Sequence, residues 1–218
     1  GYLSSAMAMD KGVTKAMFQM RGVSTPGGKS MKKKDRQDSL AALGMEFPVV
    51  VKTCCGGSSI CVYIVDDQEA YQKALDEAFE YENEVVVEEF IKGVEYTVAV
   101  VDGTAYPVVQ IVPKEGFYDY ENKYKPGAVQ ETCPAPISEE LTKRLQEAAV
   151  DGYHALEMES YARLDFIVTE DEKIYCLEAN TLPGMTPTSL IPQEAAVLGM
   201  DYPTLCEELI RVSEKKYK

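Results

Sequence analysis

Two adjacent segments near residue 170 constrain the fold most, because their residues alternate clearly between two chemical types. Tyr161 to Thr169 and Lys173 to Ala179 are each predicted to be strands. Since successive side chains on a strand point to opposite faces, one face of this pair would be apolar and would suit a core. Its residues are Leu164, Phe166, Val168, Tyr175, Leu177 and Ala179. The sequence therefore predicts an antiparallel strand pair with one buried face.

The opposite face of this strand pair carries charged and amide side chains. A tight turn between the strands would place Asp165 opposite Glu178 and Arg163 opposite Asn180. Carboxylates about 5 Å apart repel each other unless a cation neutralises them. Oxygen ligands of this kind favour Mg²⁺, whose shell is completed by water and phosphates. The alternative is an ion pair of Arg163 with one carboxylate on a solvated face, which leaves the proline-containing loop 181–190 unexplained.

A glycine-rich segment follows a short buried strand, Pro48 to Lys52. Its loop contains Gly56, Gly57, Ser58 and Ser59, and a second strand, Ile60 to Val65, comes next. Glycine lets backbone N–H groups approach an anion closely, so this loop beside a lysine could cover phosphates. The loop opens into a strand and is not a Walker A motif. An ordinary flexible hairpin remains the alternative.

Two further segments could contact a nucleotide. Glu88 to Ile91, at the end of the predicted strand Glu84 to Phe90, could present backbone groups and an apolar wall to a planar base. Lys123 and Tyr124, in the aromatic loop 116–126, could reach over a phosphate. An edge strand leaving its sheet and a mobile surface loop are the respective alternatives.

The remaining pattern mixes helices with strands. A hairpin is expected around Asp102-Gly103, and Ser138 is expected to cap a helix. The segment Lys29 to Arg36 is expected to be a solvated basic loop. The predicted helices are Ser5 to Arg21, Asp67 to Tyr81, Ile137 to Met158, Pro192 to Leu198 and Tyr202 to Lys215, and the predicted hairpin strands are Val94 to Val101 and Ala105 to Val112. This order predicts an α+β fold with antiparallel sheets.

Composition excludes several classes of function. The chain has 218 residues and a formal net charge of −14, which argues against a nucleic-acid-binding surface. No segment of about 18 apolar residues is present, so no membrane span is expected. The 6 cysteines lack zinc-site spacing and are expected to be reduced thiols of a cytoplasmic protein. The only histidine, His154, lies in a predicted helix, which disfavours a Ser–His or Cys–His nucleophile.

Six motifs, taken in order, resemble those of the D-alanine–D-alanine ligase family, which belongs to the ATP-grasp superfamily. They cover nearly the whole chain, and the last one is long and specific. The motifs are Met9-Asp10-Lys11, Val51-Lys52 with Gly57-Ser58-Ser59, Val87 to Ile91 with Glu95, Gly116 to Tyr124, Ala162 to Asp165, and Leu177 to Leu190. The resemblance implies an ATP-grasp fold, in which two α+β subdomains with antiparallel sheets hold ATP between them. It assigns residues 1–92 to a small central subdomain and 93–218 to a large C-terminal catalytic subdomain.

The resemblance also implies roles for individual residues. The residues implied for ATP binding are Lys11 and Lys52 at the phosphates, Glu88, Glu89, Phe90 and Ile91 at the adenine, Glu95 at the ribose, and Lys123 over the phosphates. Asp165, Glu178 and Asn180 are implied to hold two Mg²⁺ ions, for which Mn²⁺ could substitute. Catalytic roles fall to Ser58, Tyr124, Arg163 and the backbone near Gly184, and Ser189 and Leu190 would meet the second substrate's carboxylate.

The implied activity is the ATP-dependent joining of two D-alanines through an acyl phosphate, for peptidoglycan precursor synthesis in the cytoplasm. ATP and D-alanine would be the small-molecule partners, and the full-length protein could be a homodimer. A ligase for other amino acids is one alternative. A nucleotide-binding fragment, inactive without an N-terminal domain, is another.

Three departures from the family pattern are visible. The additional N-terminal domain of the family has no counterpart here, and the chain starts at Gly1 within a motif, so we expect that a true N-terminus is absent. Thr53 stands where a proline is usual. Cys61 stands where the glycine-rich loop usually ends in glycine, and a side chain there could restrict the loop.

Overall fold

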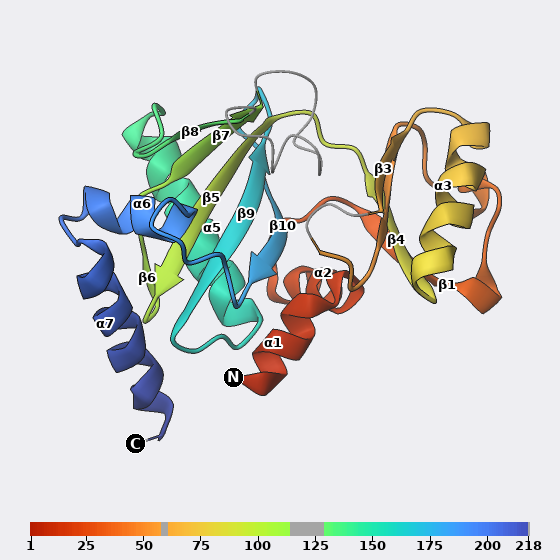
Figure 1. Ribbon diagram of the computed structural model, residues 1–218. Coiled ribbons are helices and arrows are strands. Elements are labelled where there is room, and N and C mark those ends of the chain that lie inside the picture. The colour runs from red at the N-terminus through yellow and green to blue at the C-terminus, as the bar shows by residue number, and fades with distance from the viewer. Residues whose placement is uncertain (58–60, 114–128, 218) are drawn as a thin grey trace.

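The computed structural model describes residues 1–57, 61–113 and 129–217 and contains two antiparallel sheets that stand side by side (Figure 1). One sheet has 4 strands in the order β1-β4-β2-β3. The other has 6 strands in the order β10-β9-β5-β7-β8, with β6 paired to β5. The predicted α+β class with antiparallel sheets is therefore confirmed.

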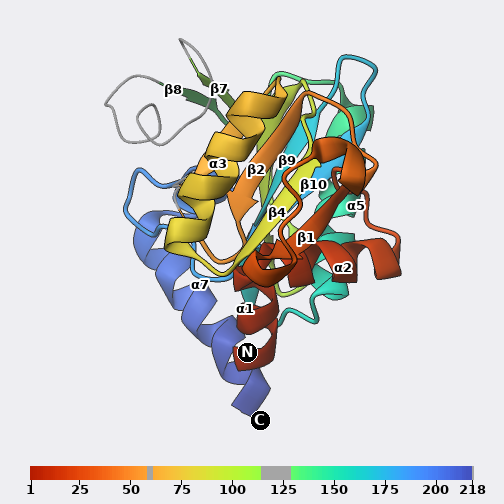
Figure 2. The same ribbon diagram turned by 90° about the vertical axis from the view of Figure 1, so that its right-hand side faces the viewer.

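The four-stranded sheet is covered on one face by the helix α3 (Gln68–Tyr81), as Figure 2 shows. Asp67 caps this helix by accepting a hydrogen bond from the backbone N–H of Ala70. Alternate valines of the sheet pack beneath α3, so the intervening residues face the other way. The strands are β1 (Gly28–Lys32), β2 (Val49–Thr53), β3 (Val62–Val65) and β4 (Glu84–Glu89), and short 3₁₀ turns lie at Lys33–Asp35 and Leu40–Leu43.

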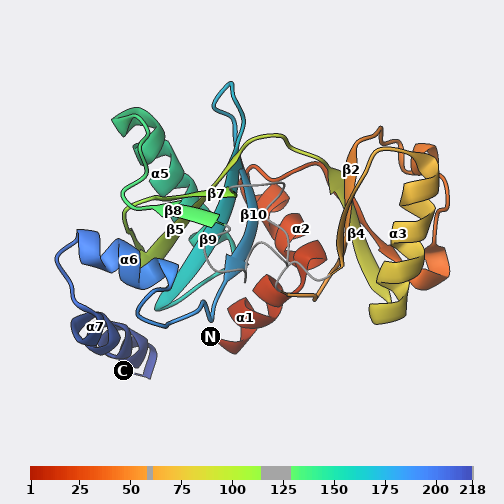
Figure 3. The same cartoon turned by 45° about the horizontal axis from the view of Figure 1, so that its top comes forward.

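The six-stranded sheet is buried on both faces. Helix α5 (Glu139–Ala155) packs on one face, and α6 (Leu190–Val197) and α7 (Tyr202–Glu214) pack on the other (Figure 3). Ser138 caps α5 as predicted, by accepting a hydrogen bond from the backbone N–H of Leu141. The strands are β5 (Val94–Val101), β6 (Thr104–Ala105), β7 (Val109–Pro113), β8 (Val129–Thr132), β9 (Tyr161–Val168) and β10 (Ile174–Asn180), and a 3₁₀ turn at Lys215–Tyr217 follows α7.

The predicted single helix Ser5 to Arg21 is wrong, because the segment forms two helices. They are α1 (Tyr2–Met9) and α2 (Lys11–Arg21), and they meet at Asp10. Asp10 has an extended backbone, and its side chain accepts a hydrogen bond from the backbone N–H of Val13 at 3.0 Å. An N-cap inside a continuous apolar pattern therefore starts a new helix.

Helices α1 and α2 lie between the two sheets (Figures 1 and 3). Ala8, Phe18 and Val23 belong to the core beneath the six-stranded sheet, while α2 also contacts β4 of the other sheet. The segment before β1 thus joins the two sheets in space. The division of the chain after residue 92 stays a prediction.

The register of β9 and β10 is as predicted at the charged end and shifted at the other. Asp165 pairs with Glu178, and Arg163 pairs with Asn180. A β-bulge lies between Cys176 and Glu178, so Cys176 joins the core. Leu177, predicted to face the core, instead lines the cavity described below. A bulge inserts one residue and exchanges the faces of those before it.

Other strand predictions need correction. Part of the expected basic loop forms the edge strand β1, whose Lys29 and Lys32 are exposed. Charged side chains are common on edge strands because they discourage further pairing. The expected strand Ala105 to Val112 is interrupted around Pro107, although the hairpin turn at Asp102 and Gly103 is confirmed, with φ of 53° and 75°. Strand β8 was not predicted.

Several element ends also differ from the predictions. Helix α5 ends at Ala155 and α6 begins at Leu190. The predicted start of β3 at Ile60 and the aromatic loop 116–126 lie outside the described residues. All 6 cysteines are free thiols. Within the part of the chain that the structure describes, no helix combines the length and the apolar character that crossing a membrane would require.

Candidate functional site

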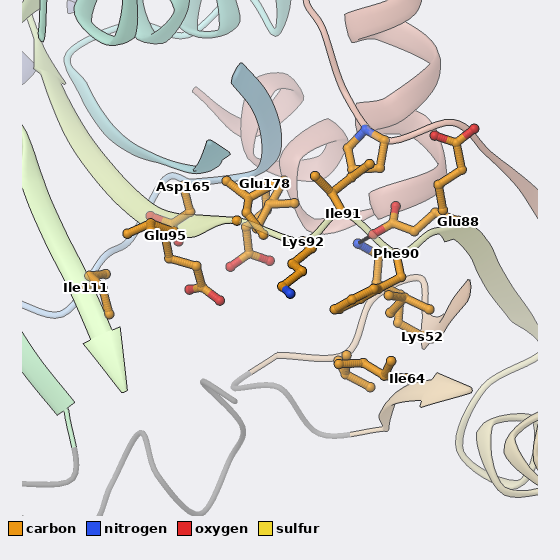
Figure 4. A pocket seen from close by; sticks show the side chains of 18 of the residues that line it. Lys52, Ile64, Glu88, Phe90, Ile91, Lys92, Glu95, Ile111, Asp165 and Glu178 are labelled. Carbon is orange, nitrogen blue, oxygen red and sulfur yellow. Dashed lines mark hydrogen bonds and ion pairs between the residues drawn. The ribbon is translucent and has the colours of Figure 1, made fainter. Parts of the chain in front are cut away.

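A cavity of about 450 Å³ lies between the two sheets, and Figure 4 shows how its side chains are arranged. Lys52 and Glu88 stand at one end, on the four-stranded sheet. Asp165 and Glu95 stand toward the other end, on the six-stranded sheet. The two charged ends are joined by the segment that links β4 to β5.

The first charged end is a buried lysine–glutamate cluster, formed by Lys15, Lys52 and Glu88. Val50 pairs with Glu88 and Lys52 pairs with Val86, so Lys52 and Glu88 are diagonal neighbours on one sheet face. Lys52 Nζ lies 2.5 Å from Glu88 Oε1, and Lys15 Nζ, from α2, lies 2.8 Å from Glu88 Oε2. Burial by itself would raise the pKa of Glu88, but the two lysines outweigh it and hold that pKa below its usual value.

The second charged end is a carboxylate cluster, formed by Arg163, Asp165, Glu178 and Asn180. Arg163 donates to both oxygens of Asp165, with Nε–Oδ1 at 2.9 Å and Nη2–Oδ2 at 2.7 Å. Asn180 Nδ2 lies 2.9 Å from Asp165 Oδ2 and 3.4 Å from Glu178 Oε1. Thr97, opposite Asp165 on β5, donates from Oγ1 to Asp165 Oδ1 at 2.6 Å. The predicted convergence of these four side chains on one face is therefore confirmed.

Lys11 connects the carboxylate cluster to the glycine-rich loop. Its Nζ donates to the backbone carbonyl of Gly56 at 2.6 Å and lies 3.8 Å from Glu178 Oε2. A single cation at the start of α2 thus stands between the loop and the carboxylates, where an anionic ligand could contact it.

Apolar side chains line the cavity between its charged ends. They come from both sheets and from the linking segment, and together they could enclose a flat apolar group. They are Pro26, Val50, Val62, Ile64, Phe90, Ile91, Val94, Ile111, Val112, Pro113, Ile167 and Leu177.

Most of the residues predicted for the site lie in or beside this cavity. Those that line it are Lys11, Lys52, Glu88, Glu89, Phe90, Ile91, Glu95, Asp165 and Glu178. Arg163 and Asn180 contact Asp165 directly. Ser58, Lys123 and Tyr124 lie outside the described residues.

Three predicted residues lie apart from the described lining of the cavity. Ser189 Oγ accepts a hydrogen bond from the Thr186 backbone at 3.0 Å and lies beside Gly184. Leu190 starts α6 and packs with Val109 and Ile111, and Ile111 is a cavity residue. The loop before α6 is thus connected to the cavity wall through Leu190.

Sequence reasoning missed Lys15, Thr97 and Leu177. Lys15 lies four residues after Lys11, so helical spacing places both on one face of α2 and could have revealed it. Thr97 could have been found only by knowing that β5 is the neighbour of β9. Leu177 was assigned to the wrong face because nothing in the sequence signals the bulge.

The two unusual residues near the glycine-rich loop have different settings. Thr53 is the last residue of β2 and pairs with Val85. Cys61 is buried and has φ of 56°, a backbone conformation that non-glycine residues seldom adopt. The position where the family usually has glycine therefore retains the conformation typical of glycine.

The donor set of the carboxylate cluster suits a magnesium ion. Among the described residues, no group of three or more His, Cys, Asp or Glu side chains could hold a metal ion. Magnesium, however, usually binds one or two carboxylates and completes its shell with water and phosphates. Asp165 and Glu178 supply two carboxylates, and the Asn180 amide would need to turn its oxygen toward the ion.

The arrangement of two α+β units around one cavity is the ATP-grasp fold. Residues 11–211 match the family model described as D-ala D-ala ligase C-terminus. The chain therefore belongs to the D-alanine–D-alanine ligase family.

Relatives and solved structures agree with this assignment. The D-alanine–D-alanine ligase of Syntrophotalea carbinolica is 44% identical over 210 residues, which are 96% of this chain and 68% of that protein. The crystal structure of the Bacillus anthracis D-alanine–D-alanine ligase complexed with ATP matches with a TM-score of 0.84 and 34% identity, covering 98% of this chain and 68% of that one. The VanG D-Ala:D-Ser ligase of Enterococcus faecalis matches with a TM-score of 0.87 and 32% identity, covering 96% and 63%.

Proposed function

We propose that this chain carries the ATP site and the catalytic groups of an ATP-dependent ligase that joins two D-alanines. The observation that carries the proposal is the placement of a lysine–glutamate cluster and a carboxylate cluster on opposite sides of one cavity in a member of this family. Cations at one end and oxygen ligands at the other are what a metal-bound triphosphate requires.

The nucleotide would lie along the cavity. Phe90 and Ile91 would form the wall against the adenine, and Glu95 would accept from the ribose hydroxyls. Lys11 and Lys52 would meet the phosphates. These placements are supported because all five residues line the cavity.

The carboxylate cluster would hold magnesium through Asp165, Glu178 and Asn180. The ion, when bound, would neutralise charge on the phosphoryl oxygens. Arg163, fixed in a bidentate pair with Asp165, would face the negative charge that develops on the reacting carbonyl oxygen. Because these hydrogen bonds are already made, little reorganisation is needed during the reaction.

The reaction would proceed in two balanced steps. A carboxylate oxygen of the first D-alanine attacks the γ-phosphorus of ATP, and the bond to ADP breaks. The amine of the second D-alanine then attacks the acyl carbon, loses a proton, and displaces inorganic phosphate. An acyl phosphate hydrolyses in water, so closure by the aromatic loop 116–126 remains part of the proposal.

The product would serve peptidoglycan precursor synthesis in the cytoplasm, and the full-length protein could be a homodimer.

A second candidate is a ligase that joins D-alanine to a different second amino acid. The likeness to a D-Ala:D-Ser ligase favours keeping this candidate, because that structure matches as well as those of the D-alanine–D-alanine ligases.

Phosphate release from ATP tests the proposal. The chain is incubated with ATP, Mg²⁺ and D-alanine alone, with D-alanine and D-serine, or with L-alanine as the control. Release with D-alanine alone is the expected result. Release only when D-serine is added would favour the second candidate, and ATP binding without release would favour a nucleotide-binding fragment.

A further inference from the structure

Lys15 is a buried lysine beside the ATP cavity that has no role in the reaction described above. It comes from α2 and is 6% exposed. Its Nζ donates to Glu88 Oε2 at 2.8 Å, to the Pro26 carbonyl at 2.6 Å and to Thr25 Oγ1 at 3.2 Å. An ammonium group has three donors, so every donor of Lys15 already has a protein acceptor.

Lys52 contacts the same carboxylate as Lys15 but has fewer hydrogen-bond acceptors. In the part of the chain that the structure describes, its Nζ has one acceptor, Glu88 Oε1 at 2.5 Å. Lys52 lines the cavity, whereas Lys15 is absent from the described lining. Among the described residues, two ammonium donors of Lys52 therefore have no acceptor and can contact a ligand.

The charges of the cluster explain why a second lysine is needed. Glu88 paired with Lys52 alone would be a neutral pair, and its attraction for phosphate would be weak. With Lys15 included, two ammonium groups and one carboxylate leave one positive charge. Burial preserves the strength of this charge, because the interior screens it far less than water does.

Each oxygen of the Glu88 carboxylate contacts a different lysine. Lys15 holds Oε2 from the helix side, and Lys52 takes Oε1 from the sheet side. Pro26 and Thr25, which precede β1, fix Lys15 in turn. Gly28 lets β1 approach β4 closely beside Glu88, since a Cβ at Gly28 would lie 2.6 Å from the Val87 carbonyl oxygen.

We propose that Lys15 is a positioning residue for phosphate binding: it compensates Glu88, so that Lys52 keeps its net charge and its donors for the ATP phosphates. This inference rests on the proposed function. It assigns Lys15 no contact with the nucleotide, because the effect passes through Glu88.

Calorimetric titration with ATP and with adenosine tests the inference on the full chain. The readout is the ratio of the two affinities, which isolates the contribution of the phosphates. We expect Lys15→Met to lower this ratio about tenfold, because Lys52 alone would then compensate Glu88 and would have less charge and fewer donors left for the phosphates. Lys33→Met is the matched control, since this exposed lysine also donates to a backbone carbonyl, that of Phe79, and its ratio should not change.

A purely structural role for Lys15 would weaken ATP and adenosine equally and leave the ratio unchanged, which would overturn the inference. If Lys15→Met fails to fold, Glu88→Gln is compared with the double variant Lys15→Met/Glu88→Gln. Because Lys15 acts through Glu88, these two should have the same ratio. A tenfold difference between them would also overturn the inference. If the unsubstituted chain itself does not prefer ATP to adenosine, the proposed function fails instead.

Discussion

The two charged clusters of the cavity differ in how fully the protein satisfies them. In the lysine–glutamate cluster, both oxygens of Glu88 have buried lysine partners within 2.8 Å. In the carboxylate cluster, Arg163 pairs closely with Asp165, but among the described residues the one ion pair of Glu178 is with Lys11 at 3.8 Å, and the Glu178 side chain is 34% exposed. The first cluster has a surplus of positive charge, and the second has a carboxylate that is weakly compensated.

This difference suggests that the two clusters have separate roles in the reaction. The preformed cationic end would determine how tightly phosphates bind, and the weakly compensated carboxylate end would require a metal ion to become active. Substitutions at the two ends should therefore affect different kinetic parameters.

The largest effect is expected for Glu178→Gln. The substitution removes the least compensated oxygen ligand, so the rate of phosphate release should fall by about a hundredfold or more while the fold remains. Steady-state kinetics with circular dichroism measures both. Glu172→Gln, in the turn of the same hairpin, is the control. Retained turnover in Glu178→Gln would refute the role of Glu178.

Lys52→Met should act mainly on binding. Loss of the cavity-facing ammonium group should raise KM for ATP about tenfold and change kcat less, because the carboxylate end is untouched. Initial rates at varied ATP concentrations separate the two parameters. Exposed Lys34 provides a charge-matched control. A tenfold fall in kcat would contradict the separate roles of the two clusters.

Thr97→Val tests how firmly Asp165 is held. The buried Thr97 hydroxyl donates to Asp165 Oδ1 at 2.6 Å, and valine has nearly the same shape without the donor. We expect a loss of about 1–2 kcal/mol in the free energy of unfolding, measured with urea. Unchanged stability would indicate that Asp165 stays oriented by its other partners, among them Arg163 and Asn180.

A smaller effect is expected on how folding stability depends on pH, and it should have opposite signs for the two buried carboxyl groups Glu194 and Glu88. Burial raises the pKa of Glu194, which accepts from the Ala99 backbone at 2.7 Å, well above its usual value, whereas Glu88 has a lowered pKa. The folded state holds the Glu194 proton more tightly than the unfolded state does. The contribution of Glu194 to the free energy of unfolding therefore falls as pH rises above about 4.5. Because Glu88 releases its proton more easily when folded, its contribution is lost as pH falls below that value.

Urea midpoints measured from acid to neutral pH check these signs. Glu194→Gln should lessen the loss of stability as pH rises, and Glu88→Gln should lessen the loss in acid. The same slope in Glu194→Gln and in the unsubstituted chain would show that Glu194 does not remain protonated.

The carboxylate cluster could be predicted from the sequence because it lies on one hairpin. Strand alternation and a tight turn fix which residues of β9 and β10 face each other, and Asp165 and Glu178 follow directly. The bulge at Leu177 escaped prediction because no residue there signals it. The break at Asp10 also escaped, since the apolar pattern continues through it.

The lysine–glutamate cluster could be predicted only in part, because its members come from α2, β2 and β4. Lys52 and Glu88 were assigned to the ATP site through resemblance, but their contact depends on the pairing of β2 with β4. Lys15 reaches Glu88 because α2 packs between the sheets, and the sequence does not reveal this tertiary packing. The roles of Ser58, Lys123 and Tyr124 stay predictions.

A crystal structure of the chain with ADP and Mn²⁺ tests the central claim most directly, since anomalous scattering locates the metal. The account predicts the base against Phe90 and Ile91, the phosphates beside Lys52, and a metal peak at Asp165 and Glu178. Nucleotide bound elsewhere, or a metal peak away from both carboxylates, would contradict it.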